Sequence, residues 1–164
     1  MMKNGKKILP YLGEHLILTI VRENRKSGKA RKVMERLILT VPYEADPAFI
    51  SSLLTKWYRK EAGAVLKEKV QEFAELIGVS YEQIHIKDQR SCWGSCSSKG
   101  NLNFNWRIIM APEPVCDYII IHELCHRIYM NHSRDFWNLV EKYCPQHESY
   151  KKWLKENYRI LYPF

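Results

Sequence analysis

The sequence predicts an α+β protein, because segments with the two-residue period of a strand occur together with segments that have the period of a helix. The strand-like segments fall near the start and before residue 108, and a long amphipathic segment separates them. The expected architecture is a small antiparallel sheet, a long helix behind it, and a C-terminal helical part. With 164 residues, 46% hydrophobic and 27% charged, the chain has the composition of a globular protein forming a single domain over residues 1–164.

The first two elements are expected to be a β-hairpin over residues 15–42 and a long helix over residues 46–78. The segments HLILTIVR and VMERLILTVP have strand composition, and a charged loop that contains glycine separates them. Asp46 followed by Pro47 is typical of a helix start, and Gly78 of a helix end. Between them apolar residues recur at spacings of three and four, which predicts one buried face.

A sheet is expected over residues 83–108, and helices over residues 112–160. The segments QIHIK, RSCWGSC and NLNFNWRI are the predicted strands, and the last alternates apolar and polar residues. That alternation predicts an antiparallel sheet with one buried face. The following helix is apolar nearly all round, so it is expected to be buried, and two more helical segments follow it.

The buried helix carries polar residues that a core does not tolerate without partners. His122 and His126 are four positions apart, so their imidazoles lie on one helix face, about 40° from each other. Glu123 lies about 100° round from His122, near a metal ion without having to bind it. This pattern, H-E-x-x-H, is typical of a catalytic zinc site in which the glutamate is the general base.

His132 is the candidate for a third zinc ligand, but a continuous helix would point it about 240° away from His126. The helix is therefore expected to end between Arg127 and Asn131. Asn131 is the best candidate for the left-handed conformation that turns the chain back. Ser133 is then expected to cap a new helix.

Charge and cysteine content bear on partners and location. The net charge of +8 is concentrated in residues 22–32 and 151–159, which favours either contact with nucleic acid or nucleotides, or a solvated basic surface. The apolar stretch near the start is interrupted and too short to span a membrane, so no membrane association is expected. Five cysteines without a disulfide pattern suit a reducing compartment, which predicts a cytoplasmic protein.

Three segments together resemble the YgjP-like metallopeptidase family, a group of small zinc peptidases similar to the WLM and SprT-type proteases. They are WGSCSSKGNLNFNWRIIMAP, IIIHELCHRIYMNHSRDFW and KYCPQHESYKKWL, and N-H-S-x-x-F-W is the most distinctive part. The resemblance implies a zincin-like fold, Zn²⁺ bound by His122, His126 and His132, Glu123 as general base, and a peptide or protein substrate. The family usually has arginine where this chain has Cys92, with Arg90 two residues earlier.

The favoured function is peptide-bond hydrolysis by a zinc-activated water, with Glu123 as general base. Two alternatives stay open: a metal-dependent nucleoside triphosphate phosphohydrolase, and a zinc-stabilised module that binds nucleic acid. Phe136 and Trp137 are interpreted as core residues. An oxyanion donor is also required, and the sequence does not choose among four candidates, Tyr129, Tyr143, His147 and Tyr150.

Overall fold

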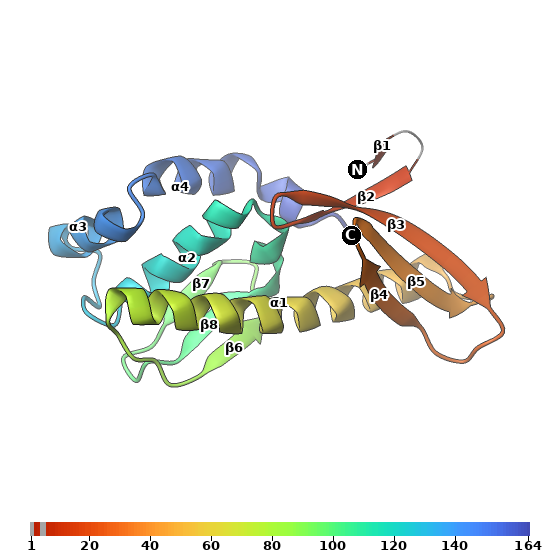
Figure 1. Cartoon of the computed structure of the whole chain (residues 1–164), viewed down its shortest axis with the longest axis horizontal. Helices are drawn as coiled ribbons and strands as arrows, with labels where there is room; N and C mark the ends of the chain where they lie inside the picture. The colour runs from red at the N-terminus through yellow and green to blue at the C-terminus, as the bar shows by residue number, and fades with distance from the viewer. Residues whose placement is uncertain (1, 4–5) are drawn as a thin grey trace.

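A five-stranded sheet forms the N-terminal part of the computed structural model, which describes residues 2–3 and 6–164 (Figure 1). Its order is β1-β2-β3-β5-β4. Strands β2 and β3 are antiparallel, as are β4 and β5, whereas β3 and β5 are parallel. The strands are β1 (Met2–Lys3), β2 (Lys6–Tyr11), β3 (Glu14–Glu23), β4 (Lys29–Val33) and β5 (Arg36–Pro42).

The hairpin expected over residues 15–42 is wrong in its pairing. The segment read as a charged loop contains β4, which turns back at Met34 and pairs with β5. Since β4 reverses the chain, β5 runs in the same direction as β3 and lies beside it in parallel. Met34 takes the left-handed conformation (φ 52°) that this tight turn needs. The basic residues of β4 suit an edge strand, where charge discourages further strand pairing.

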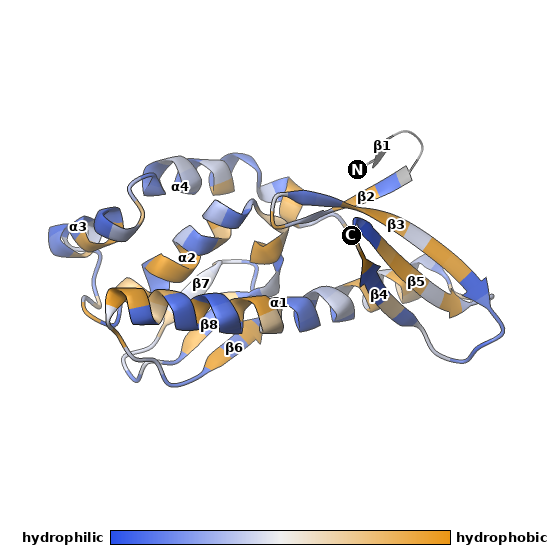
Figure 2. Ribbon diagram, viewed as in Figure 1, coloured by the Kyte–Doolittle hydropathy of each residue, from blue (hydrophilic) through white to orange (hydrophobic). Residues whose placement is uncertain are grey.

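The long helix α1 (Pro47–Ile77) confirms the helix expected over residues 46–78. The Asp46 side chain accepts a hydrogen bond from the Phe49 amide at 2.7 Å, and Gly78 ends the helix in the left-handed conformation (φ 78°). Apolar and polar positions alternate along α1 in Figure 2, as a helix with one buried face requires. The Tyr58 hydroxyl donates to the Pro10 carbonyl at 2.7 Å and so ties α1 to the N-terminal sheet.

A second sheet, of order β6-β8-β7, packs beside α1 (Figure 1). Its strands are β6 (Ile84–Lys87), β7 (Gly94–Cys96) and β8 (Leu102–Asn105). The expectation of a purely antiparallel sheet is wrong, since β6 and β8 are parallel while β7 and β8 are antiparallel. As in the first sheet, the strand formed last in sequence lies between its two predecessors. The free edge of β7 therefore faces away from β8.

The expected strand over NLNFNWRI ends at Asn105. The Asn105 side chain accepts a hydrogen bond from the Arg107 amide at 3.1 Å and caps a 3₁₀ helix, η1 (Trp106–Met110). Asn105 itself is buried, although the alternation placed it on the exposed face. Its amide donates to the Gln89 carbonyl, which satisfies the buried polar group.

The C-terminal part is helical, as expected over residues 112–160. Helix α2 is almost entirely buried and packs against α1, β7, α3 and α4. Among the described residues no helix is long and apolar enough to cross a membrane. The elements are α2 (Glu113–Cys125), α3 (Arg134–Tyr143), α4 (His147–Glu156) and η2 (Tyr158–Leu161).

Candidate metal and catalytic site

The end of α2 positions the H-E-x-x-H residues. His122 and Glu123 lie in the last turn of α2, and His126 is the residue that ends the helix. The amide of Arg127 donates to the Leu124 carbonyl at 2.9 Å, so the last turn tightens and the chain leaves the helix. The helix thus ends before His132, as the helix geometry required.

The return of His132 does not use a left-handed residue at Asn131, and that prediction is wrong. Among described non-glycine residues positive φ occurs only at Leu12 and Met34. Asn131 acts through its side chain instead: its amide oxygen accepts a hydrogen bond from the Ser133 amide at 3.3 Å. Ser133 caps α3 as expected, accepting from the Phe136 amide at 3.3 Å.

His122, His126 and His132 converge, with one ring nitrogen from each within 4.8 Å of the others. Nε2 of His132 lies 3.1 Å from Nε2 of His122. Two imidazole nitrogens on one tetrahedral zinc ion at 2.0–2.1 Å are about 3.3 Å apart, so this spacing is close to that of a ligand pair. Within the described chain these histidines form the one His, Cys, Asp or Glu cluster whose geometry suits a metal ion.

The protonation of two of these histidines also suits metal binding, which needs a neutral imidazole. Burial, reinforced by the imidazoles of His126 and His132, lowers the pKa of His122 to about 3. Burial likewise lowers the pKa of His126. The Nδ1 of His126 lies 3.0 Å from the Tyr129 carbonyl and donates to it, which leaves Nε2 unprotonated for a metal.

Phe136 and Trp137 form an aromatic wall around the three imidazoles. The Phe136 ring centroid lies 5.0 Å from that of His122, 4.5 Å from that of His126 and 4.9 Å from that of His132. Trp137 stacks on His132 at 5.8 Å. Phe136 is fully buried, as expected of a core residue, but sequence reasoning missed that these two rings fix the orientation of the histidines. Their place directly after His132, at the start of α3, was the available signal.

Glu123 is buried against Gly94, the first residue of β7. Its side chain is only 6% exposed, and burial raises its pKa to about 8 in the absence of a metal ion. A Cβ atom at Gly94 would lie 2.8 Å from both Cγ and Oε1 of Glu123. Glycine is therefore required there to make room for the carboxylate. A bound dication beside Glu123 would lower its pKa and favour the ionised form.

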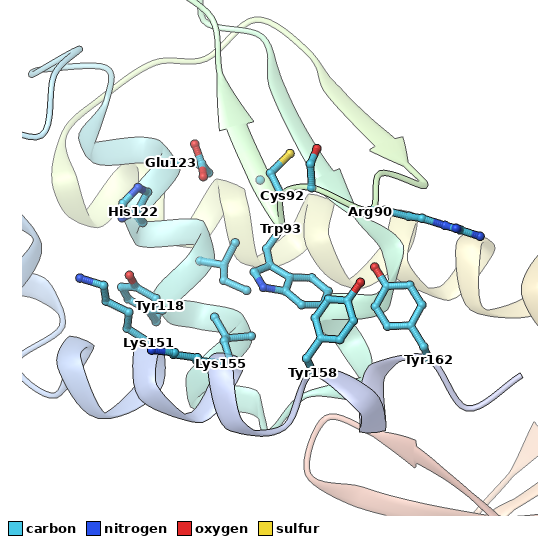
Figure 3. A pocket seen from close by; sticks show the side chains of 14 residues that line it. Arg90, Cys92, Trp93, Tyr118, His122, Glu123, Lys151, Lys155, Tyr158 and Tyr162 are labelled. Carbon is cyan, nitrogen blue, oxygen red and sulfur yellow. The ribbon is translucent and has the colours of Figure 1, made fainter.

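A pocket of about 570 Å³ opens beside His122 and Glu123 (Figure 3). Its walls come from the segment before β7, from α2, and from α4 and η2. Figure 3 shows the Arg90 side chain pointing away from His122 and Glu123. Arg90 therefore does not contact these two residues in place of the arginine that the family usually has at position 92. The lining residues are Arg90, Ser91, Cys92, Trp93, Gly94, Tyr118, Ile119, His122, Glu123, Lys151, Leu154, Lys155, Tyr158 and Tyr162.

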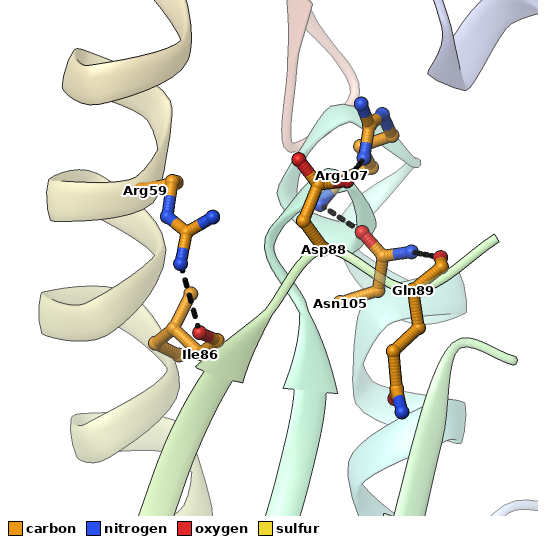
Figure 4. Close-up of polar contacts among 6 residues, drawn as sticks. All are labelled: Arg59, Ile86, Asp88, Gln89, Asn105 and Arg107. Carbon is orange, nitrogen blue, oxygen red and sulfur yellow. Dashed lines mark hydrogen bonds and ion pairs between the residues drawn. The ribbon is translucent and has the colours of Figure 1, made fainter.

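The loop that forms the β-sheet side of this pocket is held by polar contacts (Figure 4). Asp88 forms an ion pair with Arg107, and the Asn105 amide donates to the Gln89 carbonyl. Further along, the Asn105 backbone amide donates to the Trp93 carbonyl at 2.9 Å. Residues 88–93 are thereby attached at both ends to the segment that joins β8 to η1.

None of the four candidates for an oxyanion donor, Tyr129, Tyr143, His147 and Tyr150, lines this pocket. Two donors that sequence reasoning missed, the Tyr118 hydroxyl and the Lys151 ammonium group, do line it. Tyr118 precedes His122 by one helical turn, so its spacing was a signal. Lys151 comes from α4 and no local pattern connects it with the H-E-x-x-H helix.

The fold and the site together define a small α+β metallopeptidase. A family model described as the YgjP-like metallopeptidase domain matches residues 2–157. The chain belongs to this YgjP-like metallopeptidase family, which confirms the resemblance seen in the sequence. No curated protein sequence matches the chain.

Two solved structures are similar to the chain. The metallopeptidase zymogen of Pyrococcus abyssi abylysin is 22% identical, with a TM-score of 0.50, and the match covers 55% of this chain and 92% of that one. The metallopeptidase zymogen of Methanocaldococcus jannaschii jannalysin is 27% identical, with a TM-score of 0.44, and the match covers 50% and 88%. The abylysin likeness concerns the fold and supports the zincin-like architecture.

Proposed function

We propose that this metallopeptidase uses Zn²⁺ held by His122, His126 and His132, with Glu123 as general base. The convergence of the three imidazole nitrogens within 4.8 Å, next to a buried carboxylate, is the observation that carries the proposal. Three protein ligands leave a fourth position for water or substrate, which is typical of catalytic rather than structural zinc. Neutral imidazoles also bind other transition metals, so the metal has to be identified by measurement.

The reaction that follows is hydrolysis of a peptide bond. When bound, zinc supplies a water whose pKa is lowered to about 7 and polarises the substrate carbonyl. Glu123 accepts a proton from the attacking water and passes it to the amine that leaves. The aromatic wall of Phe136 and Trp137 keeps the imidazoles oriented and excludes bulk water from one side of the histidine cluster.

The substrate backbone is proposed to bind along β7. The sequence left both RSCWGSC and NLNFNWR as candidates for the receiving edge. In the described sheet β8 is paired on both sides, whereas β7 pairs with β8 alone and so has a free edge. Glu123 lies against Gly94, the first residue of this edge strand. An extended peptide that adds to β7 as a further strand would bring its carbonyl groups past Glu123.

The proposal is tested by measuring metal content and turnover together. We expect one zinc per chain by elemental analysis, and the Glu123→Gln variant to keep that zinc while losing hydrolysis of unfolded protein. His132→Ala is expected to loosen the metal. A preparation without stoichiometric metal, or a Glu123→Gln variant as active as the wild type, would contradict the assignment of ligands or base respectively.

A cytoplasmic location is proposed from the cysteines. All five, Cys92, Cys96, Cys116, Cys125 and Cys144, are free thiols in the structure. That state is stable in a reducing compartment. Localisation of a tagged chain by fractionation tests the proposal, and recovery in an oxidising compartment would contradict it.

A further inference from the structure

We propose that the pocket beside the histidine cluster binds a carboxylate of the peptide substrate close to the bond that is cleaved. This inference rests on the metallopeptidase function proposed above and adds a substrate class to it. The carboxylate is either an Asp or Glu side chain or the free C-terminus of the substrate. Both sources present the same chemistry to the pocket, and the experiment below distinguishes them.

The position of the pocket connects it with the reaction. His122 and Glu123 line it together with Gly94 of the β7 edge. A peptide lying along β7 would therefore place one of its side chains, or its terminus, in the pocket while a neighbouring carbonyl lies at Glu123. At about 570 Å³ the pocket lies in the range typical of small-ligand sites and accommodates one large side chain with room to spare.

The charge of the pocket favours an anion. Lys151 and Lys155 lie one turn apart on α4, and both line the pocket. Figure 3 shows Lys151 beside Tyr118 and Lys155 below it, both on the α4 side of the pocket. Glu123 is the one acidic residue in the lining, and the proposed reaction already uses it. Arg90 is a third cation in the lining, but its side chain points away from His122 and Glu123. An anionic group entering beside His122 would thus meet Lys151 and Lys155, whose charges no acidic residue of the wall besides Glu123 offsets.

Both lysines are available to bind an anion. Lys151 approaches Glu148 at 3.8 Å on the exposed surface, a pairing that contributes little in water. Lys155 has no salt bridge within the described part of the chain. The Lys151 ammonium also lies 5.0 Å from the Trp137 ring centroid, and Trp137 stacks on His132. This contact holds a positive charge on the rim of the histidine cluster.

The remaining walls strengthen an ionic contact. Trp93, Tyr118 and Tyr158 surround the pocket with aromatic surface, and Ile119 and Leu154 add apolar atoms. Low-polarity walls reduce screening, so a carboxylate is attracted more strongly here than on the open surface. The tyrosine hydroxyls are further donors for its oxygen atoms.

A carboxylate fits this site better than a nucleoside triphosphate. The two cations of α4, Lys151 and Lys155, match one or two negative charges beside His122, and Arg90 points away from that side. A triphosphate carries about four charges and is held in other proteins by glycine-rich loops and Mg²⁺. The metal-binding cluster of the described residues is made of the three histidines, with no group of carboxylates for a second ion. Hydrolysis of a nucleoside triphosphate is therefore the competing result that the experiment has to exclude.

The experiment compares matched peptides cleaved by the zinc-loaded protein. A quenched fluorescent peptide library locates the preferred bond, and the best peptide is then made with Glu or Gln, and with a free or amidated C-terminus. We expect loss of the recognised carboxylate to lower kcat/KM roughly tenfold or more, the usual worth of a charge-assisted hydrogen bond. A fall with Gln identifies a side chain, and a fall with amidation identifies the terminus. Either result supports the proposal.

Variants of α4 assign the effect to the pocket. The Lys151→Met/Lys155→Met double variant is expected to bring the ratio of acidic to neutral kcat/KM close to one, and Lys155→Glu to favour a Lys-containing peptide. Lys152→Met is the matched control, because Lys152 lies on the same helix, outside the pocket, with a side chain that is 74% exposed. It should keep the wild-type ratio.

Two results would overturn the proposal. Glu123-dependent cleavage of peptides at equal rates with and without the carboxylate would leave the metallopeptidase function standing and remove the carboxylate pocket. Glu123-dependent hydrolysis of a nucleoside triphosphate without cleavage of any peptide would remove both. The two failures are therefore distinguishable in the same set of assays.

Discussion

The close contact between Gly94 and Glu123 makes Gly94→Ala the most informative substitution in this chain. An added Cβ would lie 2.8 Å from two atoms of Glu123, whereas ordinary contacts of this kind begin at 3.4 Å. Either the carboxylate or β7 must therefore shift by roughly 0.6 Å. Because Glu123 is buried, it cannot rotate into solvent to avoid the methyl group. Displacement of a reacting group by about 1 Å can cost on the order of a hundredfold in rate, and we expect kcat to fall tenfold to a hundredfold.

The assay measures kcat on a fluorescent peptide, zinc content and thermal unfolding of the same preparations. Gly94→Ala should keep its zinc, since the three atoms nearest the added Cβ all belong to Glu123, the proposed base, and none to a histidine. Gly63→Ala is the control: Gly63 lies within α1 and its added Cβ would meet only Ile86 at 3.9 Å. That variant should be fully active and more stable by about 0.5–1 kcal/mol. A Gly94→Ala enzyme with wild-type kcat would refute the assignment of Glu123 as a precisely placed base.

Three further predictions concern metal affinity, pH dependence and an ion pair. Trp137→Ala should weaken zinc binding about tenfold in a chelator competition, because the stacked ring orients His132; unchanged affinity would show that the ring only fills space. Burial raises the pKa of Asp88, but the ion pair with Arg107 outweighs burial and lowers it. The ion pair therefore stabilises the folded state by about 0.5 kcal/mol at this partly exposed site. This stabilisation is present above pH 4 and is lost as the pH falls through the pKa of Asp88 in the folded protein. Unfolding of Asp88→Asn and wild type should thus converge in acid, and a constant difference would contradict this. Lys69→Met should lower the free energy of unfolding by about 1–2 kcal/mol, because Asp117, 2.8 Å from the ammonium group, would be left half-buried without its partner. An unchanged midpoint of chemical unfolding would contradict this prediction.

The parts of the fold that depend on residues close together in the sequence were predictable. Helix α1 was expected to within one residue at each end, because Asp46 and Gly78 act within one turn. Strand pairing was not predictable in this way. Whether β3 lies parallel or antiparallel to β5 depends on where β4 inserts, and β4 is so charged that its composition resembles a loop. In the second sheet all three strands were expected, but their order β6-β8-β7, which makes β6 and β8 parallel neighbours, depends on long-range packing.

The part of the site that depends on helix geometry was predictable. The positions of His122, Glu123 and His126 follow from spacing, and the need for a turn before His132 follows from the same arithmetic. The means of turning did not follow, because a hydrogen bond that the Asn131 side chain accepts from the Ser133 amide takes the place of the expected backbone conformation. The wall of the pocket needed the tertiary structure, since Gly94 and Lys151 are far from Glu123 in sequence and neither belongs to the H-E-x-x-H motif.

The order of strands in the second sheet has a consequence for the newly made protein. In the described chain β6 and β7 each pair with β8 alone, and β8 is the last of the three to be synthesised. A ribosome-bound chain that stops before Leu102 therefore has no sheet to hold Gly94 against the position of Glu123. The histidines, later still, cannot gather until α3 has also emerged. A peptidase built in this order acquires its complete site only after β8, α2 and α3 have all been synthesised.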